Sequence, residues 1–278
     1  MCVAMKTLTT TLVLTALAAL FAACDRAAPV PPPAASATPQ ATTSAVASVA
    51  AAPVVLKGDT IDTSKGPLTI VPLNHASLFF GFGGKVIAVD PTMEALKHGP
   101  LPKADYVFIT DIHPDHLDKD ALAVVGRSDT IFVGTAAVGL QHALNHVLNN
   151  HMRRDFDLFV AEGVPMYNLT RGPSEGKLFH DKGRGAGYVF TFGDKRIYVS
   201  GDTECTPEMR ALKNIDVAFL CMNLPYTMPP EEAATCASAF KPKIVYPYHY
   251  RGQDPKAFAD ALKGTGIDVR LRDWYAAP

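Results

Sequence analysis

Four side chains that commonly bind metal ions lie within six positions, at Asp111, His113, Asp115 and His116. They follow residues 105–110, a continuous apolar run that is typical of a buried strand. A turn that leaves such a strand can direct alternate side chains into one cavity, and imidazole mixed with carboxylate suits zinc, iron or manganese. A polar loop that caps a helix is the alternative interpretation, since Asp and Pro are common there. Taken alone, the stretch favours a metal site.

Three further residues of ligand type lie in loops next to apolar runs. Asp202 follows the run at 195–200, His249 follows the run at 243–248, and His180 lies in a glycine-rich connection. Loops at strand ends are where two-layer folds gather functional side chains. Each residue also has a structural interpretation: Asp202 fits a Gly-Asp-Thr turn, His249 a buried partner of a neighbouring tyrosine, and His180 a surface loop. Their order along the chain favours the functional interpretation.

The apolar pattern of the chain predicts the elements that position these residues. Residues 77–82 and 85–89 indicate two strands joined by a tight Gly-Gly turn, and 187–192 and 195–200 indicate a second hairpin. Further strands are predicted at 68–71, 105–110, 130–133, 216–221, 243–248 and 267–271, and helices at 135–149, 230–240 and 255–262, with Asp118 capping another short helix. Hairpins followed by strand and helix alternation occur twice, which predicts an α/β fold with two sheets and helices outside them.

The N-terminal residues are expected to direct export. Residues 8–23 form an uncharged run of mainly Leu, Ala, Thr and Val after Lys6, which is typical of a signal peptide at 1–23. The run is too short for a stable membrane span, which needs about 20 apolar residues. Small residues followed by Cys24 resemble a bacterial lipobox, so we expect a lipid on Cys24 that anchors the protein to a membrane, facing the periplasm or cell exterior. An ordinary cleaved signal is the alternative, and Met5 is an alternative start.

Residues 24–53 predict a tether between the lipid and the folded domain. They are mostly Ala, Pro, Ser, Thr and Val, which offer too little large apolar surface to offset the entropy of ordering. Their prolines favour extended conformations that hold a domain away from a membrane surface. The remaining residues, 54–278, are of a size that forms one domain.

Charge limits the classes of binding partner, and the cysteine count limits the number of disulfides. With 26 basic and 27 acidic residues, a formal net charge of -1 and no basic run, the chain shows no nucleic-acid surface, and a small-molecule substrate is expected. Beyond the signal, Cys205, Cys221 and Cys236 lack C-x-x-C spacing, so we expect buried thiols or at most one disulfide. Cys205, three residues after Asp202, is expected near the site.

Taken in order, these motifs resemble the metallo-β-lactamase superfamily, and within it the ascorbate-6-phosphate lactonase-like and phospholipase D-like metallohydrolases. The matching segments are Asp111 to His116, His180, Gly201-Asp202-Thr203, Pro247-Tyr248-His249-Tyr250, Asn74-His75-Ala76-Ser77, Val89-Asp90-Pro91, Tyr167-Asn168, and Asn223 with Tyr226-Thr227-Met228. They span nearly all of 68–251. The resemblance implies a four-layer αββα sandwich, with two mixed sheets face to face and helices outside, and the activity of a metal-dependent hydrolase.

The resemblance also implies a ligand assignment. One metal ion would be held by Asp111, His113 and His180, and the other by Asp115, His116 and His249. Asp202 would bridge the two ions, and Asp115 and Asp202 would both be catalytic. Asp90 would orient a ligand histidine, and His75 and Tyr226 are candidates for handling substrate or protons.

The first ligand position departs from the family pattern, which normally begins with His where this chain has Asp111. A carboxylate can still coordinate the metal, and its charge would favour Mn²⁺ or Fe over Zn²⁺; alternatively, one metal ion binds weakly. His142 and His146 compete as ligands because helical spacing would place them on one face. The family has an outer helix at this point, so we expect these two histidines to be solvated.

The implied mechanism follows from the charges of two divalent ions, with zinc as the expected metal. Ions about 3.5 to 4 Å apart share a water and lower its pKa toward about 7, so that a metal-bound hydroxide attacks a carbonyl or phosphoryl centre. A phosphodiester, lactone or ester substrate is expected, and fold resemblance alone does not choose among them. The alternatives are a non-catalytic envelope lipoprotein that retains the fold with at most one structural metal, and a redox di-iron protein.

Overall fold

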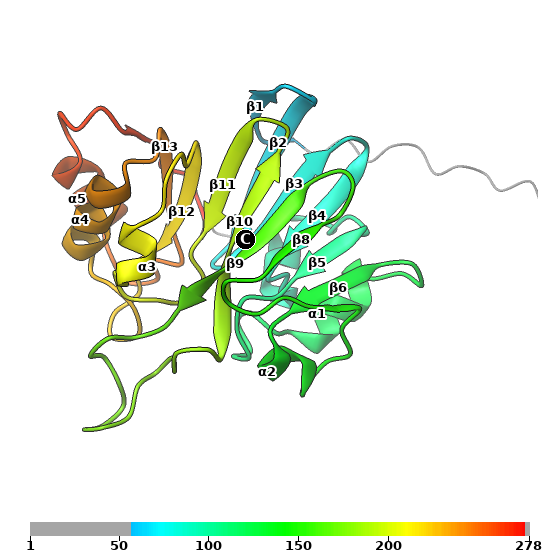
Figure 1. The fold of residues 1–278 in the computed structure, drawn as a ribbon, viewed down its shortest axis with the longest axis horizontal. Helices are drawn as coiled ribbons and strands as arrows, with labels where there is room; N and C mark the ends of the chain where they lie inside the picture. The colour runs from blue at the N-terminus through cyan, green and yellow to red at the C-terminus, as the bar shows by residue number, and fades with distance from the viewer. Residues whose placement is uncertain (1–56, 276–278) are drawn as a thin grey trace, which may run out of the picture. The chain divides into compact units, whose positions relative to one another are not determined.

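The computed structural model describes residues 57–275, which form two mixed β-sheets of seven strands each (Figure 1). The expected signal peptide, Cys24 and the tether lie outside these residues. The first sheet contains β1 (Asp59–Thr63), β2 (Gly66–Asn74), β3 (Ser77–Phe82), β4 (Lys85–Val89), β5 (Tyr106–Phe108), β6 (Ile131–Gly134) and β7 (His146–Val147), in chain order. Its pairing is antiparallel from β1 to β4 and parallel from β4 to β7.

The second sheet repeats this pattern. It contains β8 (Arg153–Asp155), β9 (Val160–Met166), β10 (Gly185–Phe192), β11 (Lys195–Val199), β12 (Val217–Cys221), β13 (Ile244–Tyr248) and β14 (Asp268–Val269), also in chain order. Pairing is antiparallel from β8 to β11 and parallel from β11 to β14. Both sheets therefore begin with hairpins and end with parallel strands, as the sequence predicts.

The core lies between the sheets. In β3 the alternate residues Leu78, Phe80 and Phe82 belong to the main core, whereas Phe79 belongs to a second cluster on the other face. The ring of Phe80 is 5.6 Å from the ring of Phe190 in β10, which joins the two sheets. This alternation makes the first sheet apolar on both faces, with one face toward the second sheet and one toward a helix.

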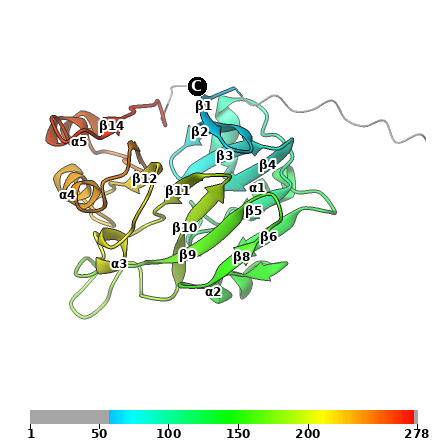
Figure 2. The same ribbon diagram turned by 45° about the horizontal axis from the view of Figure 1, so that its top comes forward.

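Short helices cover the outer faces (Figures 1 and 2). They are α1 (Lys119–Val125), α2 (Ala136–Gly139), α3 (Pro207–Arg210), α4 (Pro230–Phe240) and α5 (Pro255–Ala261), with a 3₁₀ helix η1 (Met93–His98). Asp118 caps α1 by accepting hydrogen bonds from two backbone N–H groups, as predicted. Residues of α1 pack in the outer cluster with Phe79, and residues of α4 and α5 join the main core. The chain thus forms an αββα sandwich. None of the helices within residues 57–275 has the length and apolar character needed to span a membrane.

The predicted helix at 135–149 is wrong. Thr135 caps the four-residue helix α2, and the chain then turns back so that β7 pairs with β6. Two asparagines support this path, because Asn145 Oδ1 accepts from the backbone of Phe132 and Asn149 Oδ1 accepts from the backbone of Ala136. Asn is a weak helix former that readily bonds to nearby backbone, so local apolar spacing does not extend the helix here.

Candidate metal centre

Loops after β5, β11 and β13, together with the connection before β10, bring ligand-type side chains into two clusters. Within each cluster, one nitrogen or oxygen atom per residue lies within 4.8 Å of the others. The Asp115 cluster consists of Asp115, His116, Asp202 and His249, and the Asp111 cluster consists of Asp111, His113 and His180. All are buried except Asp115 and His113, which are partly exposed. The structure therefore brings together all seven residues that the sequence nominates as ligands.

Asp202 lies between the two clusters. Its Oδ2 atom is 3.4 Å from Nε2 of His116 and 3.4 Å from Nε2 of His180, and its Oδ1 atom is 3.2 Å from Nε2 of His249. Burial opposes ionisation of Asp202, but His249 and His116 outweigh it and hold the pKa of this carboxyl well below its usual value. A charged carboxylate thus contacts histidines of both clusters, which is the geometry a bridging ligand needs.

The converging ligand atoms lack hydrogen-bond partners within residues 57–275. Nε2 of His116, Nε2 of His180, Oδ1 of Asp202 and both ring nitrogens of His249 are buried and make no hydrogen bond there. An unsatisfied buried polar atom costs about 1–3 kcal/mol. Coordination of a cation would remove this cost, and imidazole with carboxylate is a donor set that suits zinc, iron and manganese. The residues present therefore fit a metal centre.

Asp90 and Thr110 fix the ring of His116. Oδ2 of Asp90 accepts from Nδ1 of His116 at 2.8 Å and from Oγ1 of Thr110 at 2.6 Å, and the Thr110 backbone N–H donates to Oδ1 of Asp90 at 2.8 Å. Because Nδ1 donates to the carboxylate, Nε2 of His116 is the ring nitrogen left for a metal ion, and it faces Asp202. This is the contact expected of a carboxylate that orients a ligand histidine.

Asn168 and Glu204 fix the ring of His180 in a similar way. Oδ1 of Asn168 accepts from the backbone N–H of His180 at 2.8 Å and from its Nδ1 at 2.7 Å. The amide of Asn168 in turn donates to Oε1 of Glu204 at 3.1 Å. Nε2 of His180 is thereby left to face Asp202. Sequence reasoning missed Glu204, whose only signal is an acidic residue two positions after Asp202.

His75 and His249 are held together in an uncommon backbone conformation. Their rings stack with centroids 3.6 Å apart, and the backbone N–H of His249 donates to the carbonyl of His75 at 3.1 Å. Both residues have positive φ, 49° for His75 and 50° for His249, as does Asp90 at 45°. Non-glycine residues pay about 1–3 kcal/mol for this conformation and concentrate at functional sites. Backbone strain thus coincides with the candidate centre.

His75 contacts the Asp115 cluster, whereas Tyr226 does not. Nε2 of His75 is 3.1 Å from Oδ2 of Asp115, and its Nδ1 is 2.5 Å from the hydroxyl of Tyr275. Burial lowers the pKa of His75 to about 4, so this imidazole is neutral near pH 7. The ring of Tyr226 is 45% exposed and packs against Phe179 at 4.9 Å. Among the described contacts of Tyr226, none joins its hydroxyl to either cluster.

His142 and His146 lie outside both clusters. His142 packs 4.8 Å from the ring of Phe132, and His146 lies 5.8 Å from the ring of Phe156. Since the predicted helix at this point is absent, the helical spacing that made them competing ligands does not apply. The candidate centre does not use either residue.

Arg184 makes an ion pair with Asp111 that the sequence did not predict. Its Nε donates to Oδ1 of Asp111 at 3.0 Å and its Nη2 donates to Oδ2 at 2.8 Å, a two-point contact on a fully buried carboxylate. Burial alone would raise the pKa of Asp111, but hydrogen bonds from His113 and Arg184 and the nearby His116 lower it to about 2. Asp111 is therefore charged, and the guanidinium of Arg184 balances its negative charge.

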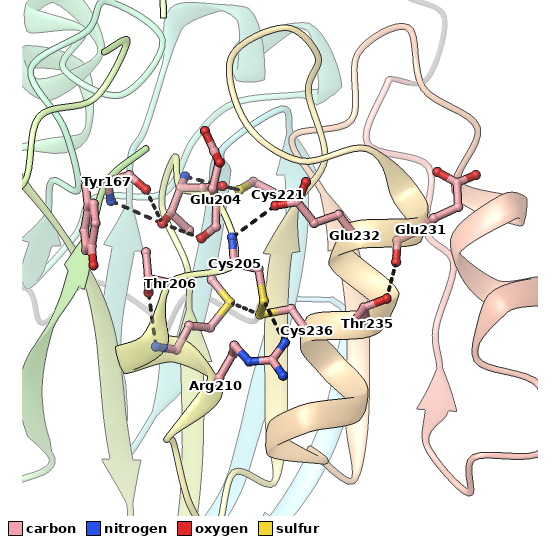
Figure 3. The surroundings of a disulfide bond; sticks show 12 residues. Tyr167, Glu204, Cys205, Thr206, Arg210, Cys221, Glu231, Glu232, Thr235 and Cys236 are labelled. Carbon is pink, nitrogen blue, oxygen red and sulfur yellow. Dashed lines mark hydrogen bonds between the residues drawn. A yellow bond between two sulfur atoms is a disulfide. The ribbon is translucent and has the colours of Figure 1, made fainter. Parts of the chain in front are cut away.

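A disulfide between Cys205 and Cys236 ties the loop that carries Asp202 to α4 (Figure 3). The Cα atoms of the pair are 5.6 Å apart. Cys221 is a buried free thiol, which confirms the expectation of at most one disulfide and buried thiols otherwise. Cys205 lies three residues from Asp202, so the crosslink anchors one side of the candidate centre.

Loss of this disulfide is expected to lower the free energy of unfolding by roughly 3–4 kcal/mol, because the crosslink closes a loop of 31 residues and constrains the unfolded chain. Urea unfolding of the wild type and of the Cys205→Ser/Cys236→Ser variant, each with and without a thiol reductant, measures the effect. The reductant should shift the wild type to the midpoint of the variant and leave the variant unchanged. A wild type that unfolds at the same midpoint with its thiols fully reduced would contradict the prediction.

Sequence comparison places this geometry among related proteins. A family model for the β-lactamase superfamily domain matches residues 69–249. A UPF0173 metal-dependent hydrolase of Pelotomaculum thermopropionicum is 31% identical over 217 residues, which cover 72% of this chain and 94% of that protein. A protein of the same description from Geobacillus thermodenitrificans is 29% identical over 204 residues, 68% of this chain and 90% of that protein. These relatives match nearly over their full length.

Solved structures extend the comparison. A crystal structure described as a metal-dependent hydrolase from Parabacteroides distasonis is 41% identical, with a TM-score of 0.74 over 79% of this chain and 99% of that one. The metallohydrolase Igni18 from Ignicoccus hospitalis is 23% identical, with a TM-score of 0.61 over 74% of this chain and 94% of that one, which shows a shared fold. Fold and sequence therefore agree.

Proposed function

This chain belongs to the metallo-β-lactamase superfamily and is a metal-dependent hydrolase, and from this premise we propose that it cleaves a phosphodiester, lactone or ester at a two-metal centre. One ion would be held by Asp115, His116 and His249, and the other by Asp111, His113 and His180, with Asp202 shared between them. Zinc is the proposed metal for both sites, since histidine provides most of the ligands.

The observation that carries this proposal is the position of Asp202, within 3.4 Å of histidines from both clusters. At this position the residues would hold two ions, which would supply a hydroxide nucleophile at neutral pH and stabilise charge on the attacked group. Asp90 and Asn168 hold the rings of His116 and His180 with their Nε2 atoms toward the centre. No Ser or Cys nucleophile is needed for this chemistry.

His75 is the residue that we propose for moving a proton. Its Nε2 atom lies 3.1 Å from Oδ2 of Asp115 beside the cluster, and its Nδ1 atom lies 2.5 Å from the hydroxyl of Tyr275. An imidazole in this position could pass a proton between the centre and the tyrosine hydroxyl. Tyr226, exposed near the His180 loop, is proposed only as a substrate contact.

The proposed setting is a bacterial membrane, with the domain facing the periplasm or the cell exterior, a lipid on Cys24 and the tether at 24–53 between membrane and domain. The order of small residues, Cys24 and a proline-rich segment supports this cellular location. The Cys205–Cys236 disulfide supports it as well, since such bonds persist mainly in oxidising compartments. Within the superfamily, the ordered set of motifs resembles the lactonase-like and phospholipase D-like branch, which favours that branch over antibiotic hydrolysis.

A substrate panel on the full chain, loaded separately with Zn²⁺ and Mn²⁺, tests the proposal. We expect turnover of bis-p-nitrophenyl phosphate, a simple lactone or p-nitrophenyl acetate that a chelator abolishes and added metal restores, with little turnover of a chromogenic β-lactam. A folded, metal-loaded protein that turns over none of these classes would contradict the proposal and favour a non-catalytic envelope lipoprotein.

A further inference from the structure

The two clusters differ in how their carboxylates are compensated. Both oxygens of Asp111 accept hydrogen bonds from Arg184, whose side chain is 18% exposed, so this carboxylate already has a cation beside it. In the Asp115 cluster, neither Asp115 nor Asp202 forms an ion pair with any Lys or Arg of residues 57–275; their side-chain neighbours within 4 Å there are histidine rings. Asp115 and Asp202 are therefore carboxylates without a Lys or Arg partner in residues 57–275, whereas the carboxylate of Asp111 is already paired with Arg184.

The unsatisfied atoms show the same difference. Among buried side-chain atoms without a hydrogen bond in residues 57–275 are Nε2 of His116, Oδ1 of Asp202 and Nε2 of His249, all from the Asp115 cluster. The Asp111 cluster contributes only Nε2 of His180. Its other members are occupied, since Nδ1 of His113 is 3.0 Å from Asp111. The Asp115 cluster thus needs a cation more than the Asp111 cluster does.

The backbone holds Arg184 in this position. Its carbonyl accepts a hydrogen bond from Oγ1 of Thr135 at 2.6 Å, and β10 begins at the next residue, Gly185. A Cβ at Gly185 would lie 2.7 Å from the carbonyl oxygen of Thr110 and 3.2 Å from Oδ1 of Asp111, so β10 passes directly alongside the carboxylate. The guanidinium is consequently built into the wall of the centre, with Nη2 3.4 Å from Nε2 of His113.

We infer that Arg184 makes the two metal positions unequal. The Asp115 cluster binds its ion first, and the Asp111 cluster takes up a second ion only in competition with the guanidinium. The physical cause is twofold: the guanidinium neutralises the charge of Asp111, and it repels a divalent cation placed beside it. Arg184 acts through Asp111 and is a positioning residue. The inference rests on the two-metal centre proposed above.

Zinc titration of the full chain tests the inference without measuring turnover. Protein stripped of metal is dialysed against buffers of fixed free Zn²⁺, and zinc per chain is determined by mass spectrometry. The wild type is expected to fill in two steps, with the second midpoint at a free zinc concentration at least about tenfold higher than the first. Arg184→Gln is expected to lower the second midpoint at least about tenfold. Arg196→Gln is the matched control, because Arg196 pairs with Glu162 away from both clusters, and it should fill as the wild type does.

A second variant covers the case in which Arg184→Gln fails to fold because Asp111 is left buried and unpaired. Asp111→His/Arg184→Gln removes both charges and supplies a neutral imidazole, and it is expected to take up two zinc ions with closely spaced midpoints. The inference is overturned if the wild type fills both positions at one midpoint, or if the folded variants fill the second position no more tightly than the wild type. Absence of turnover would instead count against the proposed function alone.

Discussion

Replacing Asp202 by Asn is expected to remove both metal ions and to lower turnover at least about 10³-fold. Within residues 57–275, this is the one carboxylate that pairs with histidines from both clusters, and the amide keeps its shape while it removes the charge that two cations would share. Loss of several kcal/mol of stabilisation at the reacting centre corresponds to a thousandfold or more, since about 1.4 kcal/mol is tenfold in rate. Metal per chain at saturating zinc and turnover of the best panel substrate measure the two effects.

Asp216→Asn is the control for this prediction. Asp216 is also a buried carboxylate, but it lies directly before β12 and pairs with Lys243 at 2.7 Å. This variant should retain both metal ions and near wild-type turnover, even with some loss of stability. If Asp202→Asn retained two ions at wild-type occupancy, the shared carboxylate would not be a bridging ligand.

The ends of strands could be predicted because they depend on residues that are neighbours in the sequence. A buried strand needs a continuous apolar run, and polar residues directly after it mark the edge where the chain turns. Asp111, Asp202 and His249 each stand just beyond such a run, and parallel strands of one sheet end at the same edge. The two-sheet architecture could therefore be predicted from the sequence, and the seven residues that the sequence and the family resemblance nominate lie together in two clusters.

Strands with a poor local signal were missed. β9 contains Glu162, Gly163 and Pro165, which are disfavoured in strands, yet it pairs along its whole length with β10. It exists because the neighbouring strand offers hydrogen-bond partners and the core covers its apolar residues. A strand that is stabilised in this way cannot be predicted from a stretch of about ten residues of its own sequence.

Residues that orient ligands were predicted only where the family resemblance included them. Asp90 was expected behind a histidine, and it contacts His116. Arg184 and Glu204 were missed because each acts on a residue far away in the chain; Arg184 lies 73 positions after Asp111. For Arg184, the one sequence signal was Asp111: an acidic residue in place of a histidine buries an extra charge, which requires a nearby cation.

Replacing His116 by Ala is expected to empty the Asp115 cluster of its metal ion and to abolish measurable hydrolysis. His116 is fully buried, its ring is fixed by Asp90, and its free Nε2 faces Asp202. The substitution removes one ligand and leaves the buried carboxylate of Asp90 without its histidine partner, so some loss of stability should accompany the loss of metal. Zinc content and turnover, measured at a temperature well below the unfolding transition, separate the two effects.

His142→Ala provides the sharpest comparison, because it makes the same chemical change at a histidine that the sequence pattern offered as a rival ligand. Its ring packs on Phe132, outside both clusters, so zinc content and turnover should stay close to those of the wild type. If both variants lost zinc and turnover equally, the losses would reflect a folding defect or a metal site other than the two clusters. A loss confined to His116→Ala would show that hydrolysis depends on the Asp115 cluster, whose residues lie in the loops that follow the strands of the two sheets.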